Sequence, residues 1–155
     1  MNAKSAGLLM YRSVNSALEF FLIHPGGPFY KNKNEGVWSI AKGIPDDNED
    51  LLLAAQREFQ EETGITPTGP FIELGHARTK SGKIIHAWAF AGTWNESDGI
   101  VSNTFLLEWP PKSGKKIEIP EADRAKWCSA EEAYMLINPQ QRIFIDKLIS
   151  VRNKQ

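Results

Sequence analysis

The sequence predicts an α+β fold in which a mixed β-sheet is covered by helices. Apolar runs of strand length recur along the chain and are separated by turns rich in Gly, Pro, Asn and Ser. One internal segment and the C-terminal segment instead show apolar residues at helical spacing. At 155 residues, with 41% hydrophobic and 24% charged residues, the chain is expected to form one domain, residues 1–155, with a core of its own.

The N-terminal third is predicted to contain three strands. Two apolar runs, residues 5–12 and 17–24, are separated by a polar four-residue turn, which favours a hairpin or a meander. The Pro- and Gly-rich segment 25–28 then ends the second run, and residues 29–36 are predicted to form a loop. Residues 38–40 are predicted to be a short strand that leads into Lys42 and Gly43.

A helix is predicted next, capped by Asp47 or Asn48 and ended by Gly64. Its inward face is expected to consist of apolar side chains, namely those of Leu51, Leu52, Ala55 and Phe59. Glu58, Glu61 and Glu62 lie at i, i+3 and i+4, so they share the opposite face within about one turn. Like charges at this spacing repel one another, and a hard divalent cation such as Mg²⁺ would relieve the repulsion.

The C-terminal half is predicted to hold further strands at residues 71–77, 84–94, 105–109 and 124–128. Residues 112–116 are expected to form a basic turn. Ser129 and Glu132 have capping-box spacing for a short helix that ends at Ile137. Asn138 and Pro139 are expected to start a second helix, whose apolar stripe contains Ile143, Phe144, Leu148 and Val151.

Residues 43–65 follow the pattern G-x5-E-x7-R-E-U-x-E-E-x-G-U, where U is a bulky apolar residue. The positions are filled by Gly43, Glu49, Arg57, Glu58, Phe59, Glu61, Glu62, Gly64 and Ile65. This pattern is the Nudix box, so the chain resembles a Nudix hydrolase. The resemblance implies the Nudix α/β/α sandwich and an Mg²⁺-dependent attack of water on a nucleoside diphosphate linked to another moiety, with Mn²⁺ as a possible substitute.

The resemblance also assigns roles to the residues of the box. Glu58, Glu61 and Glu62 are expected to be catalytic metal ligands, and the backbone carbonyl of Gly43 is expected to reach the metal as well. Arg57, also in the catalytic set, is expected to hold neighbouring carboxylates in orientation with its guanidinium fork. For Glu49 two roles remain open, a complement to the helix dipole or a partner of a box residue.

Three further site residues are predicted outside the box. Lys42 is predicted to contact phosphate, although Ala41 stands where the family often carries proline. Glu121 is the candidate for an additional acid, acting as base or extra ligand, because it lies six residues before Trp127. This spacing resembles that of asymmetrical diadenosine tetraphosphate hydrolases. Glu108 and Asp123 compete for the same role.

Aromatic residues could stack on a nucleobase. Tyr30 and Trp88 are the candidates for substrate binding, with Phe29 as a third, but aromatic residues in strands more often belong to the core. Other catalytic constellations are excluded by the sequence. Residues 46–50 hint at a calcium loop, but Leu51 and Arg57 occupy its required Gly and Glu positions. The chain has no phosphate-binding P-loop, no nucleophile elbow and no zinc spacing among its histidines.

Three functional hypotheses follow. Segments 38–43 and 102–114 look similar to bacterial Nudix proteins near the dinucleoside polyphosphate hydrolases, which favours an Ap4A-like substrate. The alternative is a pyrophosphohydrolase of nucleoside triphosphates or oxidised nucleotides. A nucleotide-sensing module without turnover is the third, and it is disfavoured because such modules tend to lose the box carboxylates.

Bulk properties limit the partners. A net charge of −1 argues against a general nucleic-acid or membrane-surface binder, while a small nucleotide remains compatible. The sequence has no membrane-length apolar run and no signal-peptide pattern, so a cytoplasmic protein is expected. Cys128, the single cysteine, is predicted to be a small buried apolar residue. The sequence makes no prediction of oligomeric state.

Overall fold

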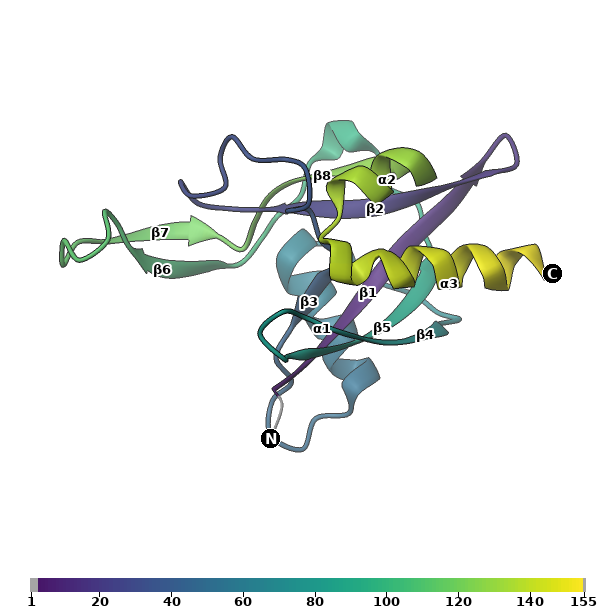
Figure 1. Ribbon diagram of the computed structural model, residues 1–155, viewed down its shortest axis with the longest axis horizontal. Coiled ribbons are helices and arrows are strands. Elements are labelled where there is room, and N and C mark those ends of the chain that lie inside the picture. Colours follow the sequence, from purple (N-terminus) through teal and green to yellow (C-terminus); the bar gives the residue numbers. More distant parts are fainter. Residues whose placement is uncertain (1–2, 155) are drawn as a thin grey trace.

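The computed structural model describes residues 3–154 and arranges them in three layers (Figure 1). A mixed sheet lies in the middle, with α1 on one face and α2 and α3 on the other, as the α/β/α expectation requires. The elements are β1 (Lys4–Val14), β2 (Ala17–Pro25), β3 (Ala41–Gly43), α1 (Leu51–Thr63), β4 (Ile72–Arg78), β5 (Ile84–Ala91), β6 (Thr104–Glu108), β7 (Lys116–Pro120), β8 (Ala122–Ser129), α2 (Ala130–Leu136) and α3 (Arg142–Asn153). Short 3₁₀ helices span Glu96–Asp98 and Pro139–Gln141.

Strand β1 is central to the sheet, whose order is β4-β5-β1-β2-β8. It pairs in parallel with β5 and in antiparallel fashion with β2. The N-terminal half of β1 also pairs with β3, so that Ala6 lies opposite Gly43, whereas its C-terminal half pairs with β2, where Tyr11 lies opposite Phe20. This pairing fixes Gly43 at the sheet immediately before the chain leaves for α1.

The two faces of the sheet carry separate cores because strand side chains alternate between faces. On the α1 face, Phe59 packs against Phe21 and Phe90 at centroid distances of 5.7 and 5.2 Å. On the other face, Phe144 and Leu148 of α3 pack over Ala87 and Ala89. The alanines Ala87 and Ala89 of β5 therefore face one helix layer, and its aromatic residues Trp88 and Phe90 face the other. Burial of these side chains contributes about 25 cal/mol per Å² of apolar area and orients α1 on the sheet.

The predicted start of α1 is wrong by two or three residues. Asp50 is the N-cap, and its side chain accepts a hydrogen bond from the backbone N–H of Leu53 at 3.2 Å. Asn48 cannot serve, because it has a φ of 64° and belongs to the preceding turn. The predicted end is confirmed: Gly64 has a φ of 79° and its N–H donates to the Gln60 carbonyl.

Several strand boundaries also differ from the prediction. Residues 38–40 contribute only isolated bridges, Ile23 with Ser39 and Trp38 with Ile137, and the ladder begins at Ala41. β5 ends at Ala91 instead of residue 94. The Gly92 N–H still donates to the Tyr11 carbonyl of β1 at 3.0 Å, and beyond it the indole of Trp94 donates to the Gly99 carbonyl. The basic turn ends where β7 begins, at Lys116, and β7 itself was not predicted.

Strands β6 and β7 form a separate two-stranded ribbon that projects from the body of the molecule (Figure 1). Phe105, Leu107, Ile117 and Ile119 lie on one side of this ribbon, because Phe105 pairs with Ile119 and Leu107 with Ile117. The ribbon leads directly into Glu121 and β8.

Most of the remaining C-terminal prediction agrees with the structure. The exception is Ile143, which was predicted to lie in the apolar stripe of the last helix but is 51% exposed, and the buried residues of α3 are instead Phe144, Ile145 and Leu148. Ser129 caps α2 and accepts a hydrogen bond from the backbone N–H of Glu132. Asn138 caps the 3₁₀ turn that precedes α3. Cys128 is fully buried, and burial raises the pKa of its thiol to about 12, so it is an apolar packing residue. Among residues 3–154, no helix combines the length and apolarity needed to span a bilayer.

Candidate active site

The turn between β3 and α1 brings Gly43 against the carboxylate of Glu58. A Cβ atom added to Gly43 would lie 2.0 Å from Glu58 Cδ and 2.1 Å from Glu58 Oε2. Only glycine therefore allows the Glu58 carboxylate to occupy this place. The packing of Phe59, the next residue, into the α1-side core fixes the rotation of the helix and hence the direction of Glu58.

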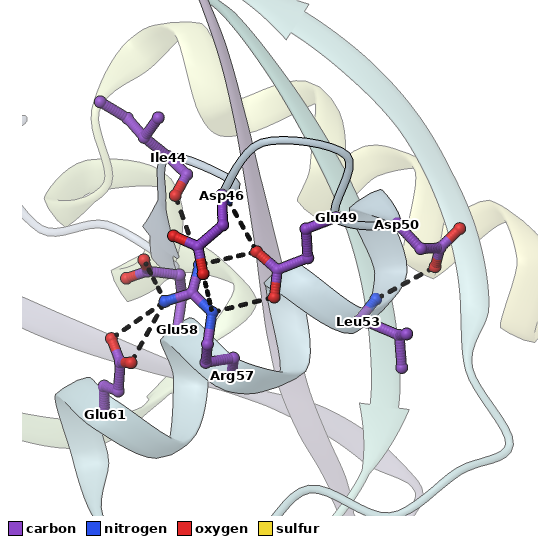
Figure 2. Close-up of polar contacts among 8 residues, drawn as sticks. All are labelled: Ile44, Asp46, Glu49, Asp50, Leu53, Arg57, Glu58 and Glu61. Carbon is purple, nitrogen blue, oxygen red and sulfur yellow. Dashed lines mark hydrogen bonds and ion pairs between the residues drawn. The ribbon is translucent and has the colours of Figure 1, made fainter.

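Arg57 connects three of the acidic residues (Figure 2). Its Nε and Nη2 atoms each donate to the Glu49 carboxylate at 2.9 Å. Its Nη1 atom donates to Glu58 at 3.0 Å and to Glu61 at 3.1 Å. Nη2 also donates to the Ile44 carbonyl at 3.3 Å, which ties the loop to the helix.

These contacts place Arg57 as an orienting fork and give Glu49 the second of its two proposed roles, that of a partner of a box residue. The hydrogen bonds from Arg57 hold the pKa of Glu49 at about 2. Glu49 precedes the N-cap, and its carboxylate also accepts from the Asp46 N–H at 2.9 Å. The bidentate pair is a charge-assisted one with fixed geometry, so it restricts where Arg57 can direct its remaining N–H groups.

Glu62 occupies the most unusual environment of the box. The residue is only 6% exposed, and its buried Oε2 atom has no hydrogen-bond partner. Burial raises the pKa of Glu62 to about 9, with the neighbouring Glu58 carboxylate as the second cause. Burial likewise raises the pKa of Glu58, and Arg57 opposes that rise. A buried carboxyl group without a partner is costly, so a ligand is expected to compensate it.

Lys42 and Glu121 lie in the same cleft as Glu62. This cleft has a volume of about 150 Å³ and is lined by Ile23, Pro25, Ser39, Ile40, Lys42, Glu62 and Glu121. Burial lowers the pKa of Lys42, and the charge of Glu62 opposes this effect. Burial raises the pKa of Glu121, and Lys42 opposes it. The cleft thus combines one ammonium group with two acids that hold their protons more tightly than usual.

Backbone hydrogen bonds position Glu121, although it is 59 residues away from Glu62 in the chain. Its N–H donates to the Asn103 carbonyl at 2.9 Å, and the Asn103 N–H donates to the Glu61 carbonyl at 2.7 Å. Its own carbonyl accepts from Gly26 at 3.2 Å. The competing acids lie elsewhere: Glu108 accepts from Lys112 and Gly114 within the ribbon, and Asp123 contacts His24.

A second cavity, of about 280 Å³, adjoins this cleft and shares Pro25, Ser39 and Lys42 with it. Its lining residues are Pro25, Tyr30, Gly36, Val37, Ser39, Lys42, Asn138 and Gln141. Tyr30 thus lines the same cavity as Lys42, which is compatible with a stacking role. Trp88 is not among the lining residues of either cavity, because it packs against the α1-side core. Phe29, which is 57% exposed, makes an edge contact with Tyr30 at 4.9 Å.

Gln141, Asn138 and Ser39 line the second cavity and were not predicted. Gln141 is buried; its Oε1 accepts from the backbone N–H of Ile40 at 3.0 Å and its Nε2 donates to Ser39 Oγ at 2.9 Å. Gln141 therefore holds the strand segment next to Lys42 from a position about 100 residues later in the chain. Nothing in the local sequence around Gln141 signals this contact.

A larger hollow, of about 690 Å³, lies towards the other end of β1, at Arg12, Trp94 and Trp127. Arg12 is paired there with Glu19 at 2.8 Å and stacks on Trp127 at 4.4 Å. The other charged residues that line it, Glu96 and Asp98, are acidic. This hollow is a poor receptor for phosphate, because its only lining cation is already engaged within the described chain.

The donors around α1 fit a hard divalent cation. Carboxylate and carbonyl oxygens are the ligands that Mg²⁺ prefers, and Glu58, Glu62 and the Gly43 backbone are brought together here. The partnerless Glu62 Oε2 marks a place where a positive ligand is needed. Within residues 3–154 no three His, Cys, Asp or Glu side chains converge tightly enough to form a complete metal site. Glu58 and Glu61 are turned to Arg57, so rotation of Glu61 would be required for it to join the set.

The change Gly43→Ala is expected to reduce kcat by about 100-fold, because the added Cβ would displace the Glu58 carboxylate. The clashing atoms end a flexible side chain, so the free energy of unfolding should fall by less than about 1 kcal/mol. Steady-state kinetics and urea unfolding measure the two effects. Gly7→Ala is the contrasting variant, since its Cβ would meet the backbone oxygen of Ala41 at 2.7 Å and should cost stability. A normal kcat in Gly43→Ala would show that Glu58 does not act from this position.

Comparison with known proteins identifies the family. A model of the NUDIX domain matches residues 1–148. The asymmetrical bis(5'-nucleosyl)-tetraphosphatase of Caenorhabditis elegans is 28% identical over 136 residues, which cover 86% of this chain and 83% of that protein. The CTP pyrophosphohydrolase of Escherichia coli is 31% identical over 98 residues, which cover 63% of this chain and 59% of that protein.

Solved structures give the same result for the fold. The binary complex of a C. elegans Ap4A hydrolase superposes with a TM-score of 0.67 at 23% identity, covering 99% of both chains. The NUDIX domain of Shewanella oneidensis NrtR complexed with ADP ribose superposes with a TM-score of 0.65 at 15% identity, covering 98% of this chain and 89% of that one. At such identities the likeness establishes the architecture alone.

Proposed function

This chain belongs to the Nudix family as a hydrolase of phosphoanhydride bonds, and we propose that its substrate is a dinucleoside polyphosphate of the Ap4A type. The observation that carries the proposal is the shared wall between the Lys42–Glu62–Glu121 cleft and the 280 Å³ cavity beside Tyr30. A phosphate chain in the cleft would have a nucleoside-sized space directly next to it. The C. elegans tetraphosphatase, aligned over 86% of this chain, supports the substrate class.

The residues of the cleft divide the work between binding and proton transfer. We assign Lys42 to a phosphate oxygen, since its largely buried ammonium group is the positive charge in a cleft that is also lined by Glu62 and Glu121. Tyr30 is assigned to the nucleobase, against which its ring can stack. Glu58, Glu61, Glu62 and the Gly43 carbonyl would hold Mg²⁺, or Mn²⁺ in its place. When bound, the cation neutralises phosphate charge and lowers the pKa of an attacking water.

Glu121 is assigned as the general base. Its carboxylate lies across the cleft from Lys42 and Glu62, and burial raises its pKa. A raised pKa brings a carboxylate closer to the operating pH and makes it a more effective base. In the proposed step, the water oxygen attacks phosphorus, Glu121 accepts a water proton, and the bridging P–O bond breaks. The leaving phosphate keeps the bond electrons, and asymmetric cleavage of a tetraphosphate gives a mono- and a triphosphate.

A second candidate is a nucleoside triphosphate pyrophosphohydrolase, which the 31% identical E. coli CTP pyrophosphohydrolase favours. The two candidates differ in the number of nucleosides held. The cavity beside Tyr30 offers space for one nucleoside, so it would accommodate a nucleoside triphosphate as well. The substrate with the higher kcat/KM decides between the two.

The proposal is tested by a substrate screen with Mg²⁺ and chromatographic identification of the products. Ap4A, CTP, ATP, an oxidised GTP and ADP-ribose are compared at equal concentrations. We expect the highest kcat/KM with Ap4A and equal amounts of AMP and ATP as products. A higher kcat/KM with CTP and release of pyrophosphate would support the second candidate. Tight nucleotide binding without turnover of any compound would instead identify a sensor module.

A further inference from the structure

His24 attaches the Tyr30 loop, defined as residues 26–36, to the body of the protein. The side chain is fully buried at the end of β2. Its Nε2 atom lies 2.6 Å from the carbonyl oxygen of Lys33 in the loop, and its Nδ1 atom lies 2.9 Å from Asp123 Oδ1 in β8. One imidazole therefore links the end of β2, the loop that follows it and the distant strand β8.

Both ring nitrogens have oxygen partners. The Lys33 carbonyl oxygen can only accept, so the contact at Nε2 is a hydrogen bond that the ring donates to the loop. At Nδ1 the partner is Asp123, which also lies 3.6 Å from the guanidinium of Arg124. Each side of the imidazole is therefore engaged by a different segment of the chain.

Charged and aromatic side chains from several segments surround this ring. Asp123 supplies a negative charge within hydrogen-bond distance, while Arg124 is shared between Asp123 and the Asn34 side chain, to which it donates at 3.2 Å. The charged end of Lys33 is directed elsewhere, over the Phe29 ring at 3.5 Å. Trp38 contacts His24 edge to face at 5.2 Å. The buried ring is thus compensated by one carboxylate and bordered by an aromatic surface.

We propose that His24 is a positioning residue that holds the Tyr30 loop over the nucleoside cavity. The proposal rests on the function proposed above, because it gives Tyr30 a substrate to bind. Residues 33 and 34 of the loop are attached through His24, Arg124 and Trp38, whose indole donates to Asn34 at 3.2 Å. Tyr30, three residues before Lys33, inherits its position from these attachments, and its N-terminal neighbour Phe29 remains exposed.

Two isosteric variants separate the two hydrogen bonds of His24. The amide nitrogen of asparagine can replace Nδ1, so His24→Asn keeps the bond to Asp123 and loses the bond to Lys33. The amide nitrogen of glutamine can replace Nε2, so His24→Gln keeps the bond to the loop. We expect KM for the nucleotide to rise about tenfold in His24→Asn, with kcat within about twofold of the parent value, and a smaller rise in His24→Gln. His76→Gln, at an exposed histidine of β4, is the matched control and should change neither constant.

A double mutant distinguishes loop positioning from a general loss of stability. In a Tyr30→Ala background, His24→Asn should raise KM no further, because the two changes remove the same contact. Additive effects of the two changes would overturn the positioning role. Equal increases of KM in His24→Asn and His24→Gln would do so as well, since the bond to the loop would then not be the one that matters.

Hydrogen exchange tests the inference without any turnover. The exchange should accelerate in residues 26–36 in His24→Asn and not in His24→Gln. Unchanged exchange in His24→Asn would overturn the inference. If instead the parent protein hydrolyses no nucleotide while the exchange comes out as expected, the proposed function fails and the attachment by His24 stands.

Discussion

Replacing Glu62 with glutamine is expected to lower kcat by about 10³-fold or more while making the metal-free protein more stable at neutral pH. The loss of rate follows from the loss of a carboxylate at the place where the cation and the phosphate are proposed to meet. The gain in stability follows from burial. The side chain is 6% exposed with an unpartnered Oε2, and a neutral amide of the same shape removes an ionisable group from that place.

The gain in stability should depend on pH in a defined direction. Because the pKa of Glu62 is raised from 4.5 to about 9, the folded protein binds more protons than the unfolded chain between these two values. The contribution of Glu62 to stability therefore falls as pH rises from 4.5 to about 9 and is constant above that range. At pH 7 the cost amounts to roughly 3 kcal/mol, given 1.36 kcal/mol per pH unit. Glu62→Gln should remove this slope.

Urea unfolding of both proteins in EDTA across pH 4 to 9 measures the slope, and steady-state kinetics measure kcat. Glu73→Gln, at an exposed glutamate of β4, serves as the matched control and should leave both unchanged. If the free energy of unfolding depended on pH in the same way in Glu62→Gln and in the parent, the Glu62 carboxyl group would have to be compensated in the folded state. A nearly normal kcat would place the metal site elsewhere.

The local part of the site could be predicted from the sequence. Glu58, Glu61 and Glu62 are arranged by the periodicity of one helix, and Gly43 and Arg57 belong to the same continuous stretch. Such spacing is read directly, because a helix fixes the relative directions of residues three and four apart. The helix end at Gly64 was predictable for the same reason, whereas its start was not. Two turn-forming residues, Asp47 and Asn48, compete with Asp50 for the cap, and only the backbone angles decide.

The non-local part of the site depends on strand pairing and could be predicted only in part. Glu121 reaches Lys42 because Asn103 bridges it to the end of α1, a contact between segments far apart in the sequence. Gln141 and His24 act through contacts that span about 100 residues. Trp88 illustrates the opposite case: its position in a strand did not reveal which face it occupies, and the parallel pairing with Leu8 places it on the α1 side. Which face of the sheet a strand residue occupies relative to the helices depends on the pairing of the whole sheet.

Replacing Arg57 with lysine is expected to lower kcat and the affinity for Mg²⁺ by about 10- to 100-fold each. Lysine keeps the positive charge but has a single nitrogen, which cannot donate to Glu49, Glu58 and Glu61 together as the guanidinium does. With the orientation lost, Glu58 and Glu61 would sample several rotamers before the cation binds. The pKa of Glu49, which Arg57 holds at about 2, should rise towards 4.5.

The rise in the pKa of Glu49 distinguishes the effect of losing the guanidinium geometry of Arg57 from the effect of losing its positive charge. Glu49 is stabilised in its ionised form, so its favourable contribution is present above pH 4.5 and is lost as pH falls through about 2. In Arg57→Lys that loss should already occur near pH 4, which carboxyl NMR titration and acid unfolding both detect. Arg12→Lys is the matched control, since Arg12 pairs with Glu19 at the other end of β1 and should leave kcat unchanged. An unchanged Mg²⁺ affinity in Arg57→Lys would show that charge alone organises the acidic residues. A raised pKa of Glu49 together with a weakened Mg²⁺ affinity would show that the geometry of the guanidinium prepares the site.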